Sequence, residues 1–281
     1  MDLSIITVTW NSADKIAEQI SSVVLGAAGL NYEQIIVDNG STDNTTQIIE
    51  DKFKNVKLIK NKGNKGFSAA NNQGVKTSSG KFILFLNPDM RLKEDSLKKI
   101  VDWMEEKNDV GIAGCKLIDK NGEFDFDAGP RRFPKTREML AMIFKIHHIF
   151  PNILDNYLMK NFDPELEQEV DSLRGSFMLV RRELIEELGW GFDPRYFIWF
   201  EDVDLCREAK KHGYKVVYTP IITCVDYVGS SFKKRESLWK QKQFTKSMFK
   251  YFKKWKPWYS WVWIAMFRPV GLLLAWFNKS L

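Results

Sequence analysis

Over its first third, this sequence alternates short apolar runs with amphipathic stretches, and this pattern limits its fold more than any other feature. The apolar runs have the length of buried strands, and the stretches between them carry apolar residues at helical spacing. Strands separated by helices form βαβ units, so we predict an α/β fold whose mostly parallel sheet carries helices on both faces. The predicted strands are 5–8, 34–37, 56–60 and 82–86, and the predicted helices are 13–25, 44–52 and 68–76.

Beyond these elements the pattern is interrupted once and then resumes. Residues 119–171 are irregular, and we interpret them as an insertion that shapes an acceptor site. We expect a catalytic domain over 1–232 and a separate C-terminal region over 233–281. The other predicted elements are helices at 97–107, 182–188 and 201–212 and strands at 110–117, 177–180 and 215–218.

The composition excludes several classes of protein. The 281 residues suffice for one large domain with a buried core, and 44% hydrophobic with 28% charged residues excludes disordered and collagen-like chains. The three cysteines are widely spread and form no C-x-x-C pair, which suits a reducing cytoplasm better than a disulfide framework or a zinc cluster. Met1 leads directly into a predicted strand, and we read no signal peptide there.

The basic residues concentrate in the last part of the chain. The whole sequence has a formal charge of +6, yet residues 233–281 alone hold twelve lysines and arginines and one acid, Glu236. The region over 1–232 is therefore acidic. Six of the ten tryptophans lie in the same basic tail. Basic residues around an apolar, tryptophan-rich segment favour an anionic membrane surface, and not nucleic acid, as the partner.

Two segments of this tail bear on how it would meet a membrane. Residues 244–255 have helical spacing, with an apolar face opposite a lysine face. Residues 258–277 are apolar for long enough to span a bilayer, but Arg268 and Pro269 stand in the middle. A central arginine costs about 2.5–3.5 kcal/mol to insert, and proline breaks helices. We therefore expect two interfacial or re-entrant segments; a helical pair packed on the catalytic domain or on a second subunit is the alternative.

Polar clusters follow two predicted strands, at the strand ends where ligands bind in such sheets. Asp38 opens the cluster at 37–43, where a carboxylate can hydrogen-bond a base or a ribose. A turn with a helix cap explains the same residues equally well. Asp89 follows the strand at 82–86 and can ligate Mg²⁺ or Mn²⁺ against a substrate diphosphate, with a simple turn as the alternative.

A third cluster contains Glu201, Asp202 and Asp204, directly after an aromatic run at 197–200. Adjacent acids repel one another unless a cation, a helix N-terminus or a proton relieves the repulsion. A helix that begins here would offer Glu201 or Asp202 to a cleft, and would let Asp204 pair with Arg207 on one face. A solvated acidic helix start fits the aromatic run poorly, because aromatic residues would hold the acids at a buried edge.

Taken in order along the chain, these segments resemble family 2 glycosyltransferases of the GT-A fold. They are most similar to the rhamnosyltransferase-like branch that builds cell-surface polysaccharides. The resemblance implies a Rossmann-like, mixed sheet. It also implies inverting, metal-dependent transfer of a sugar, with rhamnose as the first candidate, from a dTDP or UDP donor. It runs from about residue 3 to residue 231 and rests on 6–11, 37–43, 61–72, 86–89, 174–178, 191–193 and 200–207.

The resemblance also implies a role for each matching residue. Asp202 would be the general base for the acceptor hydroxyl, with Glu201 beside it. Asp89 would hold a divalent cation, Mg²⁺ or Mn²⁺, against the donor diphosphate. Gly175, Ser176 and Trp199 would border the acceptor. The nucleotide would lie near Thr9, Asn11, Asp38, Asn64, Gly66, Asn71 and Asn87, with Gly66 permitting a close backbone approach.

Two positions depart from the family pattern. Asn87 replaces the first acid of the metal motif, and Asp226 stands where the family often has a histidine before Gly-Ser, so Asp226 is a second candidate metal ligand. These departures leave open a catalytically weak sugar- or lipid-binding subunit. A sugar nucleotidyltransferase is a further alternative, although the glycine- and basic-rich N-terminal signature is missing.

The expected partners and location follow from the same resemblance and from the tail. We expect a nucleoside diphosphate sugar donor and a lipid-linked or glycan acceptor. We expect an anionic membrane surface bound through 233–281, no nucleic acid, and a homodimer as one possible assembly. The implied location is the cytoplasm, peripheral on the inner face of the cell membrane.

Overall fold

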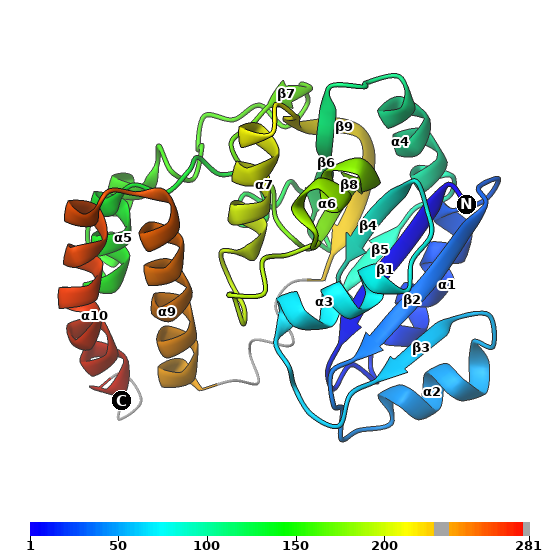
Figure 1. Ribbon diagram of the computed structural model, residues 1–281, viewed down its shortest axis with the longest axis horizontal. Helices are drawn as coiled ribbons and strands as arrows, with labels where there is room; N and C mark the ends of the chain where they lie inside the picture. The colour runs from blue at the N-terminus through cyan, green and yellow to red at the C-terminus, as the bar shows by residue number, and fades with distance from the viewer. Residues whose placement is uncertain (228–235, 278–281) are drawn as a thin grey trace.

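The computed structural model describes residues 1–227 and 236–277, which form one mixed sheet, its covering helices and a C-terminal helical hairpin (Figure 1). The structure does not describe residues 228–231 of the family resemblance. The expected domain boundary after 232 and the basic residues at 233–235 also lie outside the described residues. The strands are β1 Leu3–Thr9, β2 Tyr32–Asp38, β3 Lys57–Lys60, β4 Phe82–Leu86, β5 Met90–Leu92, β6 Val110–Ile118, β7 Gln168–Glu169, β8 Phe177–Arg181 and β9 Lys215–Asp226.

The sheet has the order β3-β2-β1-β4-β8-β6-β9-β5, with β7 paired to β9. β1 to β4 are parallel to one another, and β6 is parallel to β9, whereas β8 and β5 run antiparallel to their neighbours. The predicted mixed, mostly parallel sheet is therefore confirmed. The prediction missed the short strand β5 and ended β9 too early, since β9 continues to Asp226.

Helices cover both faces of the sheet, as predicted (Figure 1). Alternate residues of β1 show the division, because Ile5 packs with Val23 and Leu97 on one face while Ile6 packs with Leu184 and Leu205 on the other. The helices are α1 Ile16–Gly26, α2 Thr45–Lys52, α3 Phe67–Lys76, α4 Ser96–Glu105, α5 Thr136–Ile143, α6 Arg182–Leu188, α7 Glu201–Lys211, α9 Ser237–Trp255 and α10 Trp258–Phe277, with short 3₁₀ helices at Ile146–His148 and Pro151–Leu154.

The stretch at 119–171 has more regular structure than the sequence suggested. It contains α5 and both 3₁₀ helices, and its end adds β7 to the sheet. Arg131 is buried and donates hydrogen bonds from its guanidinium to the carbonyls of Phe126, Asp127, Gly129 and Pro130. Burial lowers the pKa of Arg131 to about 10, and the nearby Arg174 contributes to this shift. One buried arginine thus fixes the path of the loop that it follows.

The C-terminal tail forms an antiparallel hairpin, α9 and α10, against α5 (Figure 1). The expected break at Pro269 was wrong, because α10 is one continuous helix with Pro269 inside it. Ile264 before the proline and Gly271 and Ala275 after it are all buried, so packing holds both halves on one axis. The alternative of a helical pair packed on the catalytic domain describes this arrangement. α10 is also long and apolar enough to cross a membrane, and 17% of its most apolar 18-residue stretch is buried.

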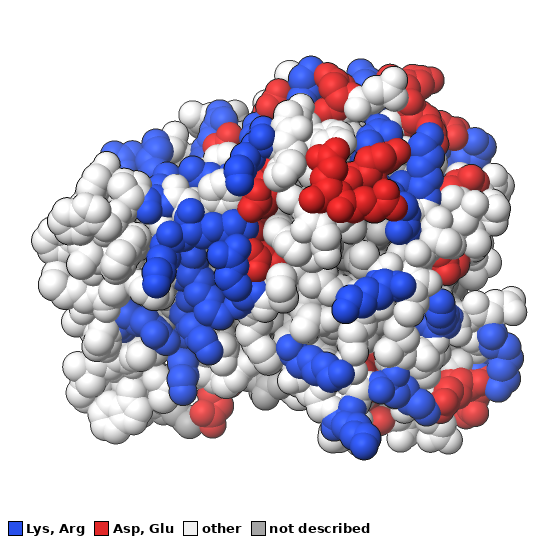
Figure 2. Space-filling view, in the orientation of Figure 1, with Lys and Arg blue, Asp and Glu red and all other residues white. Residues whose placement is uncertain are grey.

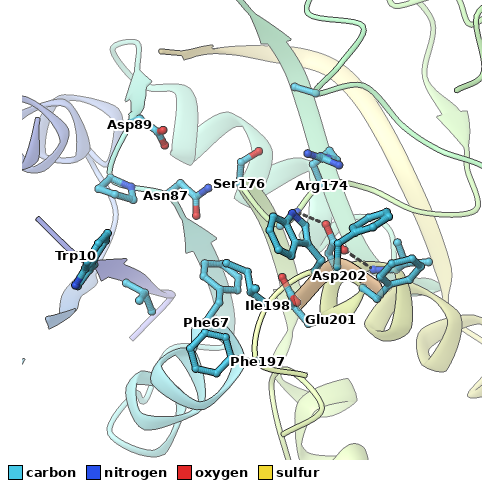
Figure 3. Close-up of a pocket in the computed structure, with 18 of the residues that line it drawn as sticks. Trp10, Phe67, Asn87, Asp89, Arg174, Ser176, Phe197, Ile198, Glu201 and Asp202 are labelled. Carbon is cyan, nitrogen blue, oxygen red and sulfur yellow. Dashed lines mark hydrogen bonds between the residues drawn. The ribbon is translucent and has the colours of Figure 1, made fainter. Parts of the chain in front are cut away.

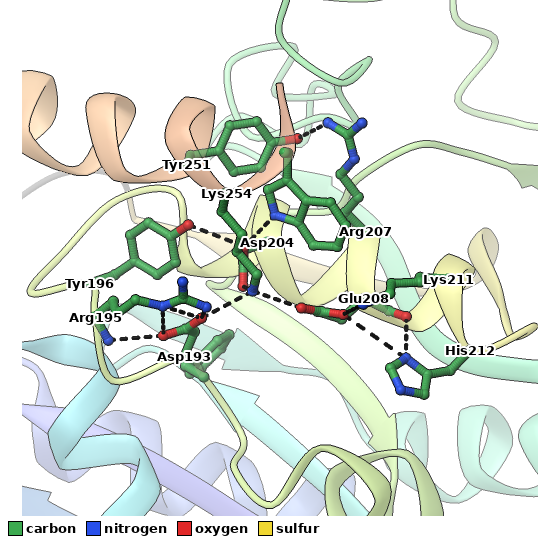
Figure 4. A network of polar contacts seen from close by, with 12 residues as sticks. Asp193, Arg195, Tyr196, Asp204, Arg207, Glu208, Lys211, His212, Tyr251 and Lys254 are labelled. Carbon is green, nitrogen blue, oxygen red and sulfur yellow. Dashed lines mark hydrogen bonds and ion pairs between the residues drawn. The ribbon is translucent and has the colours of Figure 1, made fainter. Parts of the chain in front are cut away.

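A buried ion cluster joins α9 to α7 (Figure 4). The Nζ atom of Lys254 lies 2.6 Å from Asp204, 2.7 Å from Glu208 and 3.0 Å from Asp193. Asp204 also accepts hydrogen bonds from the Trp255 indole, at 2.6 Å, and from the Tyr196 hydroxyl, at 3.1 Å. Burial opposes the charge of Lys254, but Asp204, Glu208 and Asp193 more than compensate and raise its pKa.

This cluster replaces the predicted pair of Asp204 with Arg207. The Arg207 guanidinium instead donates to the Tyr251 hydroxyl at 3.0 Å. It also lies 4.9 Å from the centre of the Trp255 ring and 5.1 Å from that of Phe133, within cation–π range. The prediction considered partners within one helix, whereas Asp204 and Arg207 of α7 find theirs on α9.

We expect the substitution Lys254→Met to lower the free energy of unfolding by about 3 kcal/mol, because removing one partner of a buried ion cluster leaves the other charges uncompensated. Chemical denaturation at neutral pH measures the difference. Lys253→Met, which removes the same charge from the adjacent exposed position, is the control and should change stability by less than about 0.5 kcal/mol. Equal effects of the two variants would contradict this account of how the hairpin is anchored.

Candidate active site

A cavity of about 320 Å³ lies at one edge of the sheet, where β1, β4 and β9 end and where β8 and β5 begin. Because β8 runs antiparallel to β4, its first residues lie beside the last ones of β4. The backbone N–H of Asn87 donates to the carbonyl of Ser176 at 2.9 Å. The predicted site residues that line this cavity are Thr9, Asn64, Asn87, Asp89, Gly175, Ser176, Trp199, Glu201, Asp202 and Asp226.

Asp89 and Asp226 reach this cavity from paired strands. Asp226 lies opposite Met90 in the β5–β9 ladder, and the backbone N–H of Tyr227 donates to the Asp89 carbonyl at 3.1 Å. Asp89 and Asp226 are each 8% exposed. Carboxylate oxygens are the ligands that Mg²⁺ and Mn²⁺ prefer, so this donor set suits such a cation. Within residues 1–227 and 236–277, no group of three or more His, Cys, Asp or Glu side chains has metal-binding geometry.

Glu201 and Asp202 line the other side of the cavity, at the start of α7 (Figure 3). The Asp202 carboxylate accepts a hydrogen bond from the Gly175 N–H at 3.1 Å. A Cβ atom at position 175 would lie 3.4 Å from the Asp202 Cβ, in ordinary van der Waals contact, so Gly175 and Asp202 are packed against each other. The first turn of a helix also favours negative charge. The α7 start and the β8 start therefore fix Asp202 together.

Glu201 is in a different electrostatic state from that of an exposed glutamate. It is 5% exposed, and its Oε2 atom has no hydrogen-bond partner among the described residues. Burial raises the pKa of Glu201 well above its ordinary value of 4.5, and the charge of the neighbouring Asp202 raises it further. Glu201 is therefore protonated over a wider pH range than usual.

Three residues that line the cavity each have a buried side-chain oxygen with no hydrogen-bond partner within the described part of the chain: Thr9 Oγ1, Ser176 Oγ and Glu201 Oε2. Buried polar groups in proteins are nearly always hydrogen-bonded, and an unpaired one costs about 1–3 kcal/mol. They come from β1, from the loop before β8 and from α7. Unpaired polar groups on three of its residues distinguish this cavity from a well-packed part of the core.

Asn11 and Asp38 are not among the residues that line this cavity, and both stabilise the turn beside it. Asp38 is 2% exposed, and its carboxylate accepts the N–H groups of Gly40 and Ser41 and the Ser41 hydroxyl. The Asn11 side chain accepts the Thr42 N–H at 2.7 Å. These contacts fit the turn interpretation of 37–43. A direct nucleotide contact by either residue stays a prediction.

Gly66 and Asn71 also lie behind the cavity wall. Gly66 has φ +93°, and a Cβ there would come within 2.7 Å of Phe197, so the close approach that requires this glycine is to an aromatic residue of the same chain. Asn71 is 1% exposed and donates to the Phe67 carbonyl within α3. Asn39, which the prediction did not single out, connects this loop to β2 through hydrogen bonds to Asn64 and to the Gly66 carbonyl.

The structure adds residues that the sequence did not assign to a site. Arg174 and Tyr157 line the cavity near Asp202, and the acids Asp125 and Asp127 reach it from the insertion. The only sequence signals were the position of Arg174 before Gly-Ser and the aromatic content of the chain. The remaining aromatic lining residues are Trp10, Phe67, Phe197, Phe200, Trp239 and Phe244, the last two from α9 (Figure 3 labels three of them).

Comparisons of sequence and of fold with known proteins identify the family of this chain. The sequence pattern of glycosyl transferase family 2 matches residues 4–189. The chain belongs to this family. One relative is the N-acetylglucosaminyl-diphospho-decaprenol L-rhamnosyltransferase of Mycobacterium tuberculosis, 28% identical over 236 residues that cover 78% of this chain and 73% of that protein. Another is rhamnosyltransferase WbbL of Escherichia coli, 27% identical over 230 residues that cover 79% and 82%.

Solved structures confirm the predicted fold. The S. aureus TarS 1–349 structure in complex with UDP-GlcNAc has a TM-score of 0.60 at 19% identity, covering 89% of this chain and 65% of that one. This chain thus spans slightly less than two thirds of that fragment. The mannosyltransferase PcManGT from Pyrobaculum calidifontis, in complex with GDP-Man and Mn²⁺, has a TM-score of 0.61 at 17% identity, covering 97% and 72%.

The raised pKa of Glu201 predicts a pH-dependent effect of Glu201→Gln. Between pH 4.5 and its raised folded value, the folded protein binds more protons than the unfolded chain, so stability falls as the pH rises. The slope approaches about 1.4 kcal/mol per pH unit. Glutamine cannot ionise. We therefore expect the variant to be more stable than the parent at pH 7 and equal to it near pH 4.

Denaturation midpoints measured from pH 4 to pH 8 test this expectation. Glu186→Gln, a substitution at an exposed glutamate, is the control and should reproduce the pH profile of the parent. A difference between Glu201→Gln and the parent that stays constant with pH would show that Glu201 ionises normally.

Proposed function

We propose that this protein transfers a sugar from a nucleoside diphosphate donor to a hydroxyl of a lipid-linked or glycan acceptor, with inversion at the anomeric carbon. The observation that carries the proposal is that Asp89, Asp226 and Asp202 line one cavity, with Asp89 on the side opposite to Asp202 (Figure 3). Membership of glycosyl transferase family 2 supports the reaction class. Rhamnose is the sugar that we favour, because it stands in the names of two relatives.

The donor would occupy the half of the cavity near β1 and β4. Thr9, Asn64 and Asn87 offer polar atoms there, and the Trp10 ring lies beside them as a surface on which a base can stack. Two related folds, TarS 1–349 and PcManGT, were solved with UDP-GlcNAc and GDP-Man, which supports a nucleoside diphosphate sugar as the donor. Asp38 and Asn11 would act indirectly by holding the turn that borders this half.

The residues present fit a divalent cation. Asp89 and Asp226 would hold it, and the donor diphosphate would supply further oxygen ligands, since the described chain offers two carboxylates there. A bound Mg²⁺ or Mn²⁺ would stabilise the negative charge that develops on the diphosphate. Asn87 would contribute a neutral amide in place of a second acid. The related PcManGT was solved with Mn²⁺, which supports this choice of cation.

Asp202 would supply the general base. As the acceptor oxygen attacks the anomeric carbon, the bond from that carbon to the diphosphate breaks, the bonding electrons leave with the diphosphate, and the hydroxyl proton passes to the Asp202 carboxylate. Such a base contributes about 10²–10⁴-fold in rate. Because Asp202 and Asp89 lie on different sides of the cavity (Figure 3), attack and departure would take place on opposite faces of the sugar, which would give inversion.

Protonated Glu201 would assist by donating a hydrogen bond to the acceptor or the donor sugar. Ser176 and Gly175 would border the acceptor beside Asp202. The other interpretations are weaker. Family membership disfavours a sugar nucleotidyltransferase. A catalytically weak binding subunit would bind donor without hydrolysing or transferring it, and the following experiment separates it from an enzyme.

We expect Asp202→Asn to lower the transfer rate at least 10²-fold while nucleotide binding persists, because asparagine keeps the hydrogen bond from Gly175 but accepts no proton. Thermal stabilisation by dTDP- and UDP-sugars, with and without Mn²⁺, measures binding, and release of nucleoside diphosphate measures turnover. Asp89→Asn should show the converse, a loss of the Mn²⁺-dependent stabilisation. Asp14→Asn, at an exposed position outside the cavity, is the control. Near-normal turnover of Asp202→Asn would remove Asp202 from this role.

We also propose that α10 places the enzyme on the inner face of the cell membrane, as a peripheral protein. The outward side of this helix is apolar, with Trp258 68%, Leu273 54% and Trp276 53% exposed. Figure 2 shows lysine and arginine side chains gathered beside it, over α9. The exposed members of this group include Lys242, Lys246 and Lys253. Apolar side chains beside lysines are typical of helices that lie at an anionic lipid surface.

Replacing Trp263 and Leu273 by serine should weaken binding to phosphatidylglycerol vesicles at least tenfold, because each buried apolar side chain contributes about 1.5–3 kcal/mol. Both side chains are exposed, 48% and 54%, so folding should be unaffected. Co-flotation with vesicles measures binding, and sedimentation measures assembly. Val24→Ser, at an exposed apolar position of α1, is the control. Unchanged flotation together with loss of a dimer would assign this face to a second copy of the chain.

A further inference from the structure

A second cavity lies between the helical hairpin and the insertion. Its volume is about 340 Å³, and it is separate from the cavity that contains Asp202. The two cavities share Trp199 and Phe244 in their walls. The remaining lining residues are Met142, Lys145, His147, His148, Ser237, Lys240, Gln241 and Ala275.

The chemistry of this second cavity suits an anion. Lys145 and Lys240 bring two ammonium groups, His147 and His148 two imidazoles, and Ser237 and Gln241 further polar groups. Among the described residues that line it, none is acidic. Lys145 and Lys240 also take part in none of the ion pairs found within residues 1–227 and 236–277. By contrast, Lys254, which lies on α9 as Lys240 does, has three carboxylate partners.

Two residues of this cavity are held in an uncommon backbone conformation. Lys145 has φ +58° and Trp199 has φ +66°, both in the left-handed region that side chains other than glycine rarely adopt. Such conformations persist where the surroundings enforce them, often at functional sites. Lys145 follows α5 and its Nζ atom contacts the carbonyl of Leu274 in α10 at 3.5 Å, so its position is coupled to the hairpin.

The position of the cavity indicates what the anion would be attached to. On one side, Trp199 and Phe244 separate it from the site where the acceptor hydroxyl would meet Asp202. On another side, Ala275 of α10 contributes to the wall, and Trp276, the next residue of this helix, is 53% exposed. A ligand that extends from the first cavity, through the basic one, to the apolar face would have a sugar, a charged middle and an apolar end.

We propose that this basic cavity binds the diphosphate of an acceptor in which a sugar is joined through diphosphate to an isoprenoid lipid. This inference rests on the proposed function, and it assigns the acceptor class to particular residues. The ammonium groups of Lys145 and Lys240 bind the diphosphate, Trp199 packs between it and the acceptor sugar, and the lipid follows the exposed face of α10. Recognition of the lipid carrier is thereby separate from recognition of the donor nucleotide.

Binding of farnesyl diphosphate to the full chain tests the proposal, with tryptophan fluorescence as the readout because Trp199 lines the cavity. The unaltered protein should bind farnesyl diphosphate at least tenfold more tightly than farnesol or inorganic pyrophosphate. The variant Lys145→Gln/Lys240→Gln should lose at least tenfold of this affinity. The variant Lys242→Gln/Lys246→Gln removes the same charge from the same region, outside the cavity, and should change it less than threefold.

Phosphatidylglycerol vesicles distinguish the two sources of lipid phosphate. Lys242→Gln/Lys246→Gln should weaken vesicle binding more than Lys145→Gln/Lys240→Gln does, which is the reverse of the farnesyl diphosphate result. The proposal would be overturned if both double variants weakened farnesyl diphosphate binding equally, or if Lys145→Gln/Lys240→Gln weakened only vesicle binding. Equal affinity of the unaltered protein for farnesyl diphosphate and inorganic pyrophosphate would also overturn it. Lys240→Gln alone, which leaves the contact of Lys145 with Leu274 in place, repeats the test if the double variant is unstable.

Failure of this inference can be distinguished from failure of the proposed function. Thermal stabilisation of the unaltered protein by nucleotide sugars and Mn²⁺ reports on the donor cavity and needs none of these variants. Donor binding without selective farnesyl diphosphate binding would reject the basic cavity alone. Selective farnesyl diphosphate binding without any donor binding would retain the cavity and reject the glycosyl transfer.

Discussion

The candidate site depends on two strands that run against their parallel neighbours. β8 begins where β4 ends, and β5 begins where β9 ends, so one edge of the sheet receives strand starts as well as strand ends. Backbone hydrogen bonds from Asn87 to Ser176 and from Tyr227 to Asp89 hold this edge. In a wholly parallel sheet, loops would carry these side chains. Here β9 itself carries Asp226, while Asp89 and Ser176 directly precede β5 and β8 and are held by the two backbone hydrogen bonds, which gives the site a rigid base.

The helical hairpin is part of the site as well as an addition to the domain. Trp239 and Phe244 of α9 line the first cavity, and Lys254 of the same helix anchors it to α7, which carries Asp202. The left-handed φ values of Trp199 and Phe200, each costing about 1–3 kcal/mol, occur where this helix packs. The Phe200 ring lies 5.5 Å from Phe244 and 5.4 Å from Tyr251. Contacts with α9 thus offset strain beside the acids.

Local patterns predicted the elements well wherever packing agreed with them, as at the apolar strand Phe82–Leu86 and its following Asp89. Local patterns predicted the wrong element ends at two prolines, Pro220 and Pro269. β9 passes Pro220 because a shift in register between β6 and β9 accommodates it, from Cys115–Thr219 to Lys116–Thr223, and the extension brings Asp226 to the site. α10 passes Pro269 because both of its halves are packed. The partners of Lys254 and the walls of the basic cavity join distant segments, which no local pattern reveals.

The adjacent acids Glu201 and Asp202 illustrate how burial can assign different roles to similar side chains. Two charged carboxylates at the buried start of α7 would repel each other. Burial and the charge of Asp202 raise the pKa of Glu201, so its protonated form, which does not repel Asp202, persists to higher pH than in an exposed glutamate. Asp202 keeps the hydrogen bond from Gly175 and the favourable end of the helix dipole. One acid is thereby suited to donate a hydrogen bond and the other to accept a proton, so the sequence Glu-Asp supplies both groups from one turn of helix.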